Sequence, residues 1–173
     1  MLLILVFTLL KFFKSLRCYK KSYCVILYLC VFLVFCVFPI ACYFYDSILV
    51  NFELFKHFNH MVSGRLYWAN EAICEYSIAL LPRNIIFEKQ NWVDSSIIAI
   101  LIRYGLITYM LVAGLFLYFA YLISKKKDII MAVIFIILLF HSVFDQELLL
   151  FEYNYFIFVW AYNNTSRELL HLD

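Results

Sequence analysis

Residues 23–45 read YCVILYLCVFLVFCVFPIACYFY, an apolar run that contains no charged side chain. Because about 20 apolar residues in a helix cross the hydrocarbon core of a bilayer, this run is long enough to span a membrane. A second run, residues 97–123, is interrupted only by Arg103. The whole chain has 173 residues, of which 66% are hydrophobic, and a soluble domain of this size could not bury so much apolar surface. The sequence therefore predicts that lipid surrounds the chain.

Three further apolar segments are less complete. Residues 129–144 form a shorter third span, and residues 148–162 form a weaker fourth because Glu152 and Asn154 interrupt it. Polar groups at membrane depth are costly, so this last helix should face protein or a wet cavity. The segment 1–10 is too short to cross a bilayer and resembles the end of a cut helix. We predict a single all-α integral membrane domain over the whole chain, with four to five transmembrane helices.

The basic residues give the expected orientation. A cluster between Lys11 and Lys21 and a second one at 125–127 flank the same ends of successive spans. The positive-inside rule places both clusters in the cytoplasm, so that residues 46–96 form a large extracytoplasmic loop. The predicted localisation is the plasma membrane, with several passes.

The outer loop carries a helical pattern. Apolar residues recur in it at three- and four-residue steps: Leu66, Ala69, Ile73, Tyr76 and Leu80. Polar residues occupy other faces: Asn70, Glu71 and Glu75. Ser63 is a candidate N-cap, Gly64 gives the chain freedom to turn, and Pro82 would stop the helix. We predict an amphipathic helix over 66–80 that lies along the membrane surface.

Several classes of function find no support in the sequence. The net charge of +2 is too small for nucleic-acid binding, and the six cysteines show no CxxC spacing. Glu53, His57 and His60 would share a helix face, but such a set is common by chance, so we expect no metal and no cofactor. Neither a catalytic triad nor a phosphate-binding glycine loop is present.

Three residues are candidates for chemistry at the outer face: Arg65 at the start of the amphipathic helix, Asp94 before the second long span, and Arg103 within it. Arg103 would lie about 9 Å below the interface, from where its guanidinium can reach upward. All three could meet in one outward-facing cavity. Arg65 and the first amides of its helix could bind a phosphate, or Arg65 could be an interfacial anchor. Asp94 could be a general base or simply the N-cap of the next helix.

A second polar group is expected near the outer end of the third span. It comprises His141, Asp145 and Glu147, together with Glu152 and Asn154 of the following segment. Interhelical hydrogen bonding is the expected role of such side chains.

Three motifs in this order resemble a known family. They are SGRLYW at 63–68, WVDSS at 92–96 and LIRYGLI at 101–107. Together they resemble the carboxy-terminal half of the polysaccharide polymerases of the O-antigen and capsule polymerase and ligase superfamily. Ser95 stands where that family often has Asn, and Pro82 stands where it commonly has Gly. Family members also have many more spans, so the chain is similar to a truncated half of such an enzyme.

The resemblance implies a glycosyltransferase-type enzyme. It would transfer a growing glycan from an undecaprenyl pyrophosphate carrier onto another lipid-linked repeat unit, with no nucleotide sugar and no metal. Arg65 would hold the pyrophosphate, Arg103 would assist it, and Asp94 would accept a proton from the attacking hydroxyl. Tyr67 and Trp68 would belong to the substrate-binding surface. Membrane lipid and other polysaccharide-assembly membrane proteins are the implied partners.

Other classes of function stay open. The chain could be a non-catalytic small membrane subunit that docks through its outer loop, or an inactive polymerase fragment. A transporter fragment is a weaker alternative, because only Arg103, Glu152 and Asn154 supply polarity at membrane depth.

Overall fold

The computed structural model describes residues 20–85, 93, 95–145 and 159–160, and within these residues all regular structure is helical. The elements are α2 (Lys20–Phe32), the π-helical turn η1 (Leu33–Val37), α3 (Phe38–Tyr43), the short 3₁₀ turn η2 (Leu49–Asn51), α4 (Glu53–Met61), α5 (Arg65–Tyr76), α6 (Ser96–Arg103), α7 (Gly105–Lys126) and α8 (Ile129–Phe144).

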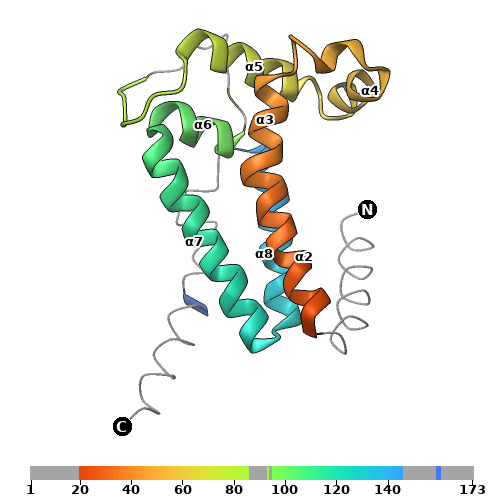
Figure 1. Ribbon diagram of the computed structural model, residues 1–173, viewed down its shortest axis with the longest axis vertical. Helices are drawn as coiled ribbons and strands as arrows, with labels where there is room; N and C mark the ends of the chain where they lie inside the picture. Colours follow the sequence, from red (N-terminus) through yellow and green to blue (C-terminus); the bar gives the residue numbers. More distant parts are fainter. Residues whose placement is uncertain (1–19, 86–92, 94, 146–158, 161–173) are drawn as a thin grey trace.

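The first predicted span forms one continuous helical rod, made of α2, η1 and α3 (Figure 1). Pro39 lies inside this rod, where its missing N–H would leave the carbonyl of Phe35 without its usual partner. The π-helical turn comes directly before the proline, and the hydroxyl of Tyr109 on α7 donates a hydrogen bond to the Phe35 carbonyl. The rod therefore continues through a proline because a second helix satisfies the freed carbonyl.

The second predicted span, residues 97–123, is divided into two helices, and its later part forms α7, which is long and apolar enough to cross a membrane. The short helix α6 ends at Arg103, and α7 begins at Gly105 in a new direction (Figure 1). Gly105 has φ +77°, and a Cβ atom there would lie 2.7 Å from the backbone carbonyl carbon of Leu81. The backbone of Leu80 and Leu81 thus passes too close to Gly105 for any side chain at this position. The amides of Leu106 and Ile107 donate to carbonyls of that segment, at 2.8 and 3.2 Å.

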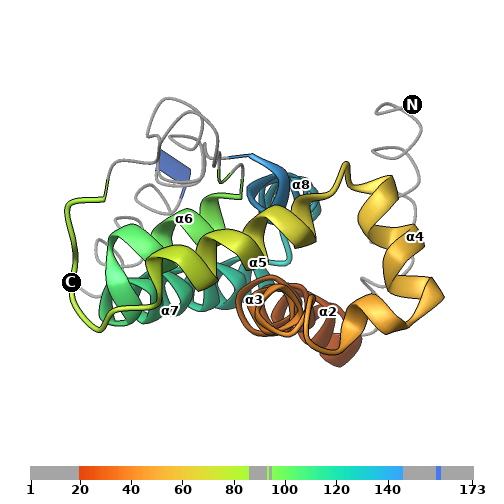
Figure 2. The ribbon, with the colours of Figure 1, turned by 90° about the horizontal axis from the view of Figure 1, so that it is seen from above.

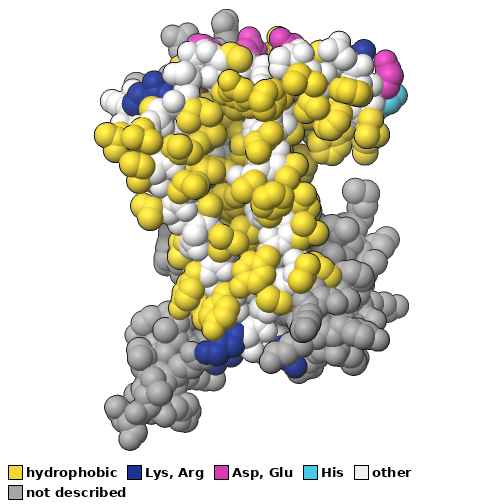
Figure 3. All heavy atoms as spheres, viewed as in Figure 1, with side chains coloured by type: hydrophobic (Ala, Val, Ile, Leu, Met, Phe, Trp, Pro, Cys, Tyr) yellow, Lys and Arg dark blue, Asp and Glu magenta, His cyan; other side chains and the backbone are white. Residues whose placement is uncertain are grey.

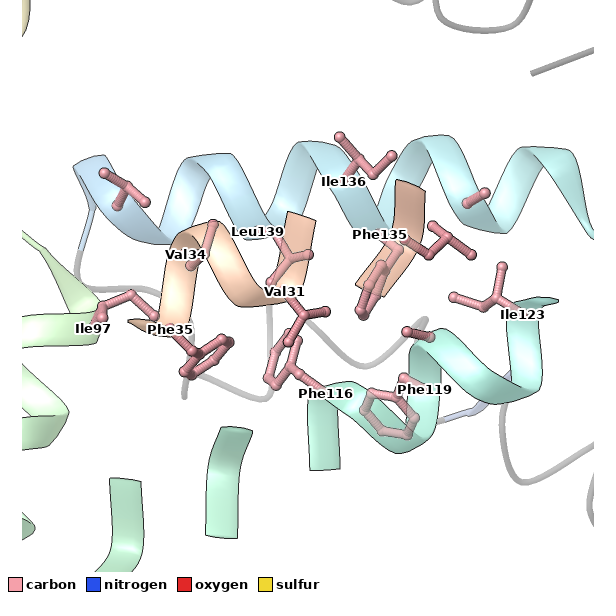
Figure 4. Close-up of a cluster of buried hydrophobic side chains, with 14 of the residues drawn as sticks. Val31, Val34, Phe35, Ile97, Phe116, Phe119, Ile123, Phe135, Ile136 and Leu139 are labelled. Atoms are coloured by element: carbon pink, nitrogen blue, oxygen red, sulfur yellow. The ribbon is translucent and has the colours of Figure 1, made fainter. Parts of the chain in front are cut away.

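The third apolar segment, residues 129–144, forms the helix α8, which is shorter than the two candidate membrane spans and closes the core. Asp128 caps its N-terminus, since its Oδ1 accepts from the amide of Met131 at 3.0 Å. Figure 4 shows side chains from α2, α7 and α8 packed together. Phe116 lies at the centre, with its ring centroid 5.4 Å from that of Phe35 and 5.8 Å from that of Phe135. Segments 1–10 and 148–158 lie outside the described residues.

The helices divide into a long bundle and a cap at one end. The rod, α7 and α8 run lengthwise, while α4, α5 and α6 lie at the end where α3 finishes (Figures 1 and 2). The start of α2 and the turn from α7 to α8, with Lys125 and Lys126, lie at the other end, as the sequence predicts (Figure 1). We call the end with α4 and α5 the loop end.

Among the residues that the structure describes, two helical segments are long and apolar enough to cross a membrane, Cys24–Tyr43 and Gly105–Lys126. Only 28% of the first and 33% of the second is buried inside the protein. Large apolar side chains therefore cover the outside of the bundle, as Figure 3 shows.

The amphipathic helix of the outer loop is present as α5, but its surroundings differ from the prediction. Its apolar face, with Leu66, Ala69 and Ile73, is buried in a cluster shared with α3 and α6, so α5 does not lie along the membrane surface on that face. Asn70 is buried too, where the sequence placed it on a polar face. Its Nδ2 donates to the carbonyls of Cys42 and Tyr43, both at 2.9 Å, and thereby caps the end of α3.

The helix α5 ends at Tyr76, before the predicted Leu80. Ser77 adopts φ 55°, and the guanidinium of Arg83 donates to the carbonyls of Tyr76 and Ser77, at 3.0 and 2.6 Å. A cation at the C-terminus of a helix satisfies its last carbonyls. The residues after Tyr76 are not helical. The carbonyls of Ala79 and Leu80 instead accept hydrogen bonds from amides in the first turn of α7.

Candidate functional site

Arg65 is the first residue of α5, and it points at the end of α8. Its Nη1 donates to the carbonyl of Phe144, the last residue of α8, and its Cζ lies 5.5 Å from the centroid of the Phe144 ring. Both contacts favour a cation, because the C-terminus of a helix and the face of an aromatic ring carry negative potential. Arg65 therefore ties the outer loop to the core bundle.

The segment that flanks Asp94 reaches the same place. Ser96 donates from its amide to the Asp145 carbonyl at 3.0 Å and from its hydroxyl to the same oxygen, and the hydroxyl of Ser95 donates to the Ser142 carbonyl at 3.4 Å. Ser95 and Ser96 are both buried. Asp94 itself lies outside the described residues, but Arg65 and the residues after Asp94 meet at adjacent residues of α8.

The N-cap interpretation of Asp94 is wrong. The helix α6 begins at Ser96, and Ser95 occupies the cap position with extended dihedral angles. A capping role belongs to the residue directly before the first helical one, so Asp94 is one residue too early for it.

The first-turn amides of α5 are already occupied. The amides of Leu66 and Tyr67 donate to Oδ1 of Asn59 at 3.0 and 3.3 Å, and those of Arg65 and Trp68 donate to preceding backbone carbonyls. The prediction that these amides help to bind a phosphate is therefore wrong. Anion binding at this helix start depends on the guanidinium of Arg65.

Sequence reasoning also named the wrong cap. Ser63 and Gly64 both adopt left-handed dihedral angles, with φ 55° and 78°, and no side-chain cap bond forms at Gly64, which occupies the N-cap position. The cap comes from Asn59 on α4, because the left-handed turn folds α4 back toward the start of α5. An acceptor seven residues before the amide that donates to it follows no local spacing rule.

Replacing Asn59 by alanine should loosen the start of α5. Loss of a side-chain cap costs about 1 kcal/mol, so we expect a lower unfolding midpoint and faster hydrogen exchange at the amides of Leu66 and Tyr67. Asn59→Asp, which keeps an acceptor oxygen, should preserve both quantities, and His57→Ala on the same helix should leave the exchange unchanged. Unaltered exchange in Asn59→Ala would contradict this capping role.

Tyr67 and Trp68 are exposed on α5. Their ring centroids lie 5.3 Å apart, with the ring planes at 75°. This edge-to-face pair presents aromatic surface at the loop end, beside the start of the helix that carries Arg65.

The structure does not bring Arg103 to Arg65. Arg103 is the last residue of α6, seven residues after Ser96, which corresponds to about 10 Å along the helix. Its carbonyl accepts from the amide of Arg83 at 2.8 Å, and Arg83 caps the far end of α5. The two arginines thus lie at opposite ends of the α5–α6 pair. The predicted depth of Arg103 within a straight span is wrong, because the helix breaks at the next residues.

The predicted polar group at the end of α8 is found in part. Nε2 of His141 lies 4.0 Å from Oδ2 of Asp145, and both side chains are about half-exposed. Glu147, Glu152 and Asn154 lie outside the described residues.

On α4, the acidic residue of the Glu53, His57 and His60 set makes an ion pair. Oε1 of Glu53 accepts from Nζ of Lys56 at 3.4 Å, an exposed ion pair. In the part of the chain that the structure describes, no group of three His, Cys, Asp or Glu residues could hold a metal ion.

The candidate site is therefore the junction of α5, α6 and α8 at the loop end, with Arg65 at its centre and Ser95 and Ser96 beside it. It offers one guanidinium, and two exposed aromatic rings follow on the same helix. No protein-family model, no curated protein and no solved structure matches the chain.

Proposed function

We propose that the chain is a multi-pass protein of the plasma membrane that polymerises lipid-linked polysaccharide repeat units at the outer face. The membrane part of this proposal is supported by the apolar surface of the bundle. Met110 and Leu111 on α7 are 64% and 70% exposed, and Val25 on α2 is 62% exposed. Contiguous apolar surface of this kind is unfavourable in water and favourable in lipid.

The orientation follows from charge. Lys125 and Lys126 end α7 at the end away from α4 and α5, and cytoplasmic loops are enriched in lysine and arginine. The loop end, with Arg65, then faces the outside. A lipid-linked glycan presents its sugars and its pyrophosphate on that side of the membrane.

The observation that carries the enzymatic part is the convergence of Arg65 with the Ser95–Ser96 segment at the last residues of α8. In the proposed reaction, the anomeric carbon of the donor glycan forms a bond to an acceptor hydroxyl and breaks its bond to undecaprenyl pyrophosphate. Asp94 takes the hydroxyl proton, and Arg65 stabilises the charge on the departing pyrophosphate. No metal ion or nucleotide is needed for these steps.

Tyr67 and Trp68 would supply the contact with sugar rings. Their exposed edge-to-face pair lies next to Arg65 in the sequence of α5, and the C–H faces of sugars pack well on aromatic rings. Arg103 is left out of this proposal, because it lies at the other end of α6.

The role of Asp94 can be tested by Asp94→Asn in a host whose polysaccharide is shortened when the gene is deleted. The amide keeps the shape of the side chain but cannot accept the proton, so we expect a loss of about a hundredfold or more in polymerisation. Polysaccharide chain length on a gel and the amount of protein in the membrane fraction are the measurements. Full-length chains made by Asp94→Asn at a normal protein level would reject the catalytic role.

A second candidate function is a non-catalytic membrane subunit. It is favoured by the hydrogen bond from Arg65 to the Phe144 carbonyl, because this bond links two helices and has a structural role. In this case Arg65 holds α5 on α8, and the outer loop is a docking surface for another polysaccharide-assembly protein. The two candidates differ in what a lysine at position 65 should do, as argued in the Discussion.

A further inference from the structure

The short helix α4 carries an apolar face that the rest of the described chain leaves uncovered. Leu54 and Met61 are 76% and 81% exposed, and Phe58 between them is 46% exposed. Their spacings of four and three residues place them on one side of the helix. Every residue of α4 retains some exposure, because none of its side chains is classed as buried.

The other side of α4 is polar. Lys56 and His60, four residues apart, are both exposed, and Lys56 pairs with Glu53 at 3.4 Å. The helix is therefore divided lengthwise into an apolar and a polar half, which is typical of helices that lie at a boundary between lipid and water.

The placement of α4 fits such a boundary. Two views at right angles show α4 lying across the direction of the α2–α3 rod, at the level where that rod ends (Figures 1 and 2). Figure 3 shows hydrophobic atoms on the side of this region that faces along the bundle, and charged atoms on the opposite side. Exposed Phe44, Ile48 and Phe52 lead from the rod to α4, so that the apolar surface of the rod continues onto the helix.

We infer that α4 is an interfacial helix, whose apolar face lies against the acyl chains just below the headgroups of the outer leaflet. Its partner is the lipid surface. Aromatic side chains such as Phe52 and Phe58 are suited to this depth. The inference rests on the membrane insertion proposed above and is independent of glycan transfer. It assigns to α4 the position that the sequence suggested for α5, whose apolar face is covered by α3 and α6.

Site-specific photo-crosslinking of the full-length protein in lipid nanodiscs tests this inference. A benzophenone amino acid is placed at Leu54 or Phe58 on the apolar side, at His60 on the polar side, and at Leu111 on α7. The lipid is phosphatidylglycerol mixed with phosphatidylcholine, with an alkyne tag on the acyl chain. We expect several-fold more tagged lipid on positions 54 and 58 than on position 60, and strong labelling at position 111.

Each other outcome has a defined meaning. Equal labelling at 60 and 58, or labelling at neither position, overturns the inference while labelling at Leu111 upholds membrane insertion. A crosslink from Phe58 to a second copy, or to another segment of the same chain, identifies that segment as the cover and also overturns it. Absence of lipid label at Leu111 removes the membrane proposal itself, and the inference with it.

Discussion

Arg65→Ala should abolish long glycan chains while the protein still enters the membrane. The guanidinium at the start of α5 is the cation that the proposed reaction needs beside the departing pyrophosphate, since the amides around it are already bonded. Removal of one preorganised donor to a developing anion costs about a hundredfold or more in rate. The measurement is the length distribution of polysaccharide in a deletion strain that carries the variant, with the protein quantified in the membrane fraction.

Two further variants separate catalysis from structure. Lys56→Ala removes an exposed cation at the same end, which forms an ion pair with Glu53 on its own helix, and should leave chain length unchanged. Arg65→Lys keeps a positive donor for the Phe144 carbonyl but loses the planar fork that matches phosphate oxygens. A polymerase should stay strongly impaired with lysine, whereas a structural clamp should be rescued by it. Normal chains in Arg65→Ala would exclude the pyrophosphate role.

Gly105→Ala should destabilise the protein severely. The new Cβ would lie 2.7 Å from the carbonyl carbon and oxygen of Leu81 and 2.8 Å from the oxygen of Leu80, all of them backbone atoms that cannot turn away. The residue would also need φ +77°, which side chains other than glycine rarely adopt. Strain and overpacking together should lower the free energy of unfolding by about 2 to 5 kcal/mol.

Gly114 is the matched control for this substitution. It lies in the middle of α7, and a Cβ atom there would meet nothing within 4 Å. Gly114→Ala should therefore leave the unfolding midpoint unchanged or raise stability by up to about 1 kcal/mol. Midpoints measured in detergent by thermal or denaturant unfolding give both values. Equal midpoints for the two alanine variants would contradict this prediction. They would show that the backbone of Leu80 and Leu81 can move away from position 105 at little cost.

The long helices could be predicted from the sequence because their signal is local. The run at 23–45 is apolar throughout and the run at 129–144 is apolar up to His141, and each is helical over nearly its whole length. The break after Arg103 could not be predicted from hydropathy, since the residues on both sides are equally apolar. Its cause is a segment near Leu81 that passes beside Gly105, a contact between distant parts of the chain.

The candidate site was predictable only as a set of residue types. Arg65 and Ser96 do reach one end of the bundle, but they bind the backbone carbonyls of Phe144 and Asp145. Every residue has a backbone carbonyl, so the sequence does not indicate which one serves as the partner. The partner of Arg65 lies 79 residues away along the chain. For the same reason the caps made by Asn59 and Arg83 were missed, because both depend on turns that fold the chain back on itself.

The burial of α6 sets an order for biosynthesis. Ile98 and Ile102 pack in the cluster that includes α5, whereas Ile97 and Ile100 pack in the core that includes α8. During synthesis α5 is made first, α6 second and α8 last. The isoleucines of α6 that pack against α8 therefore lack this partner until α8 has been made. The contact between α6 and the core can therefore be completed only late in synthesis, after α8 has been made.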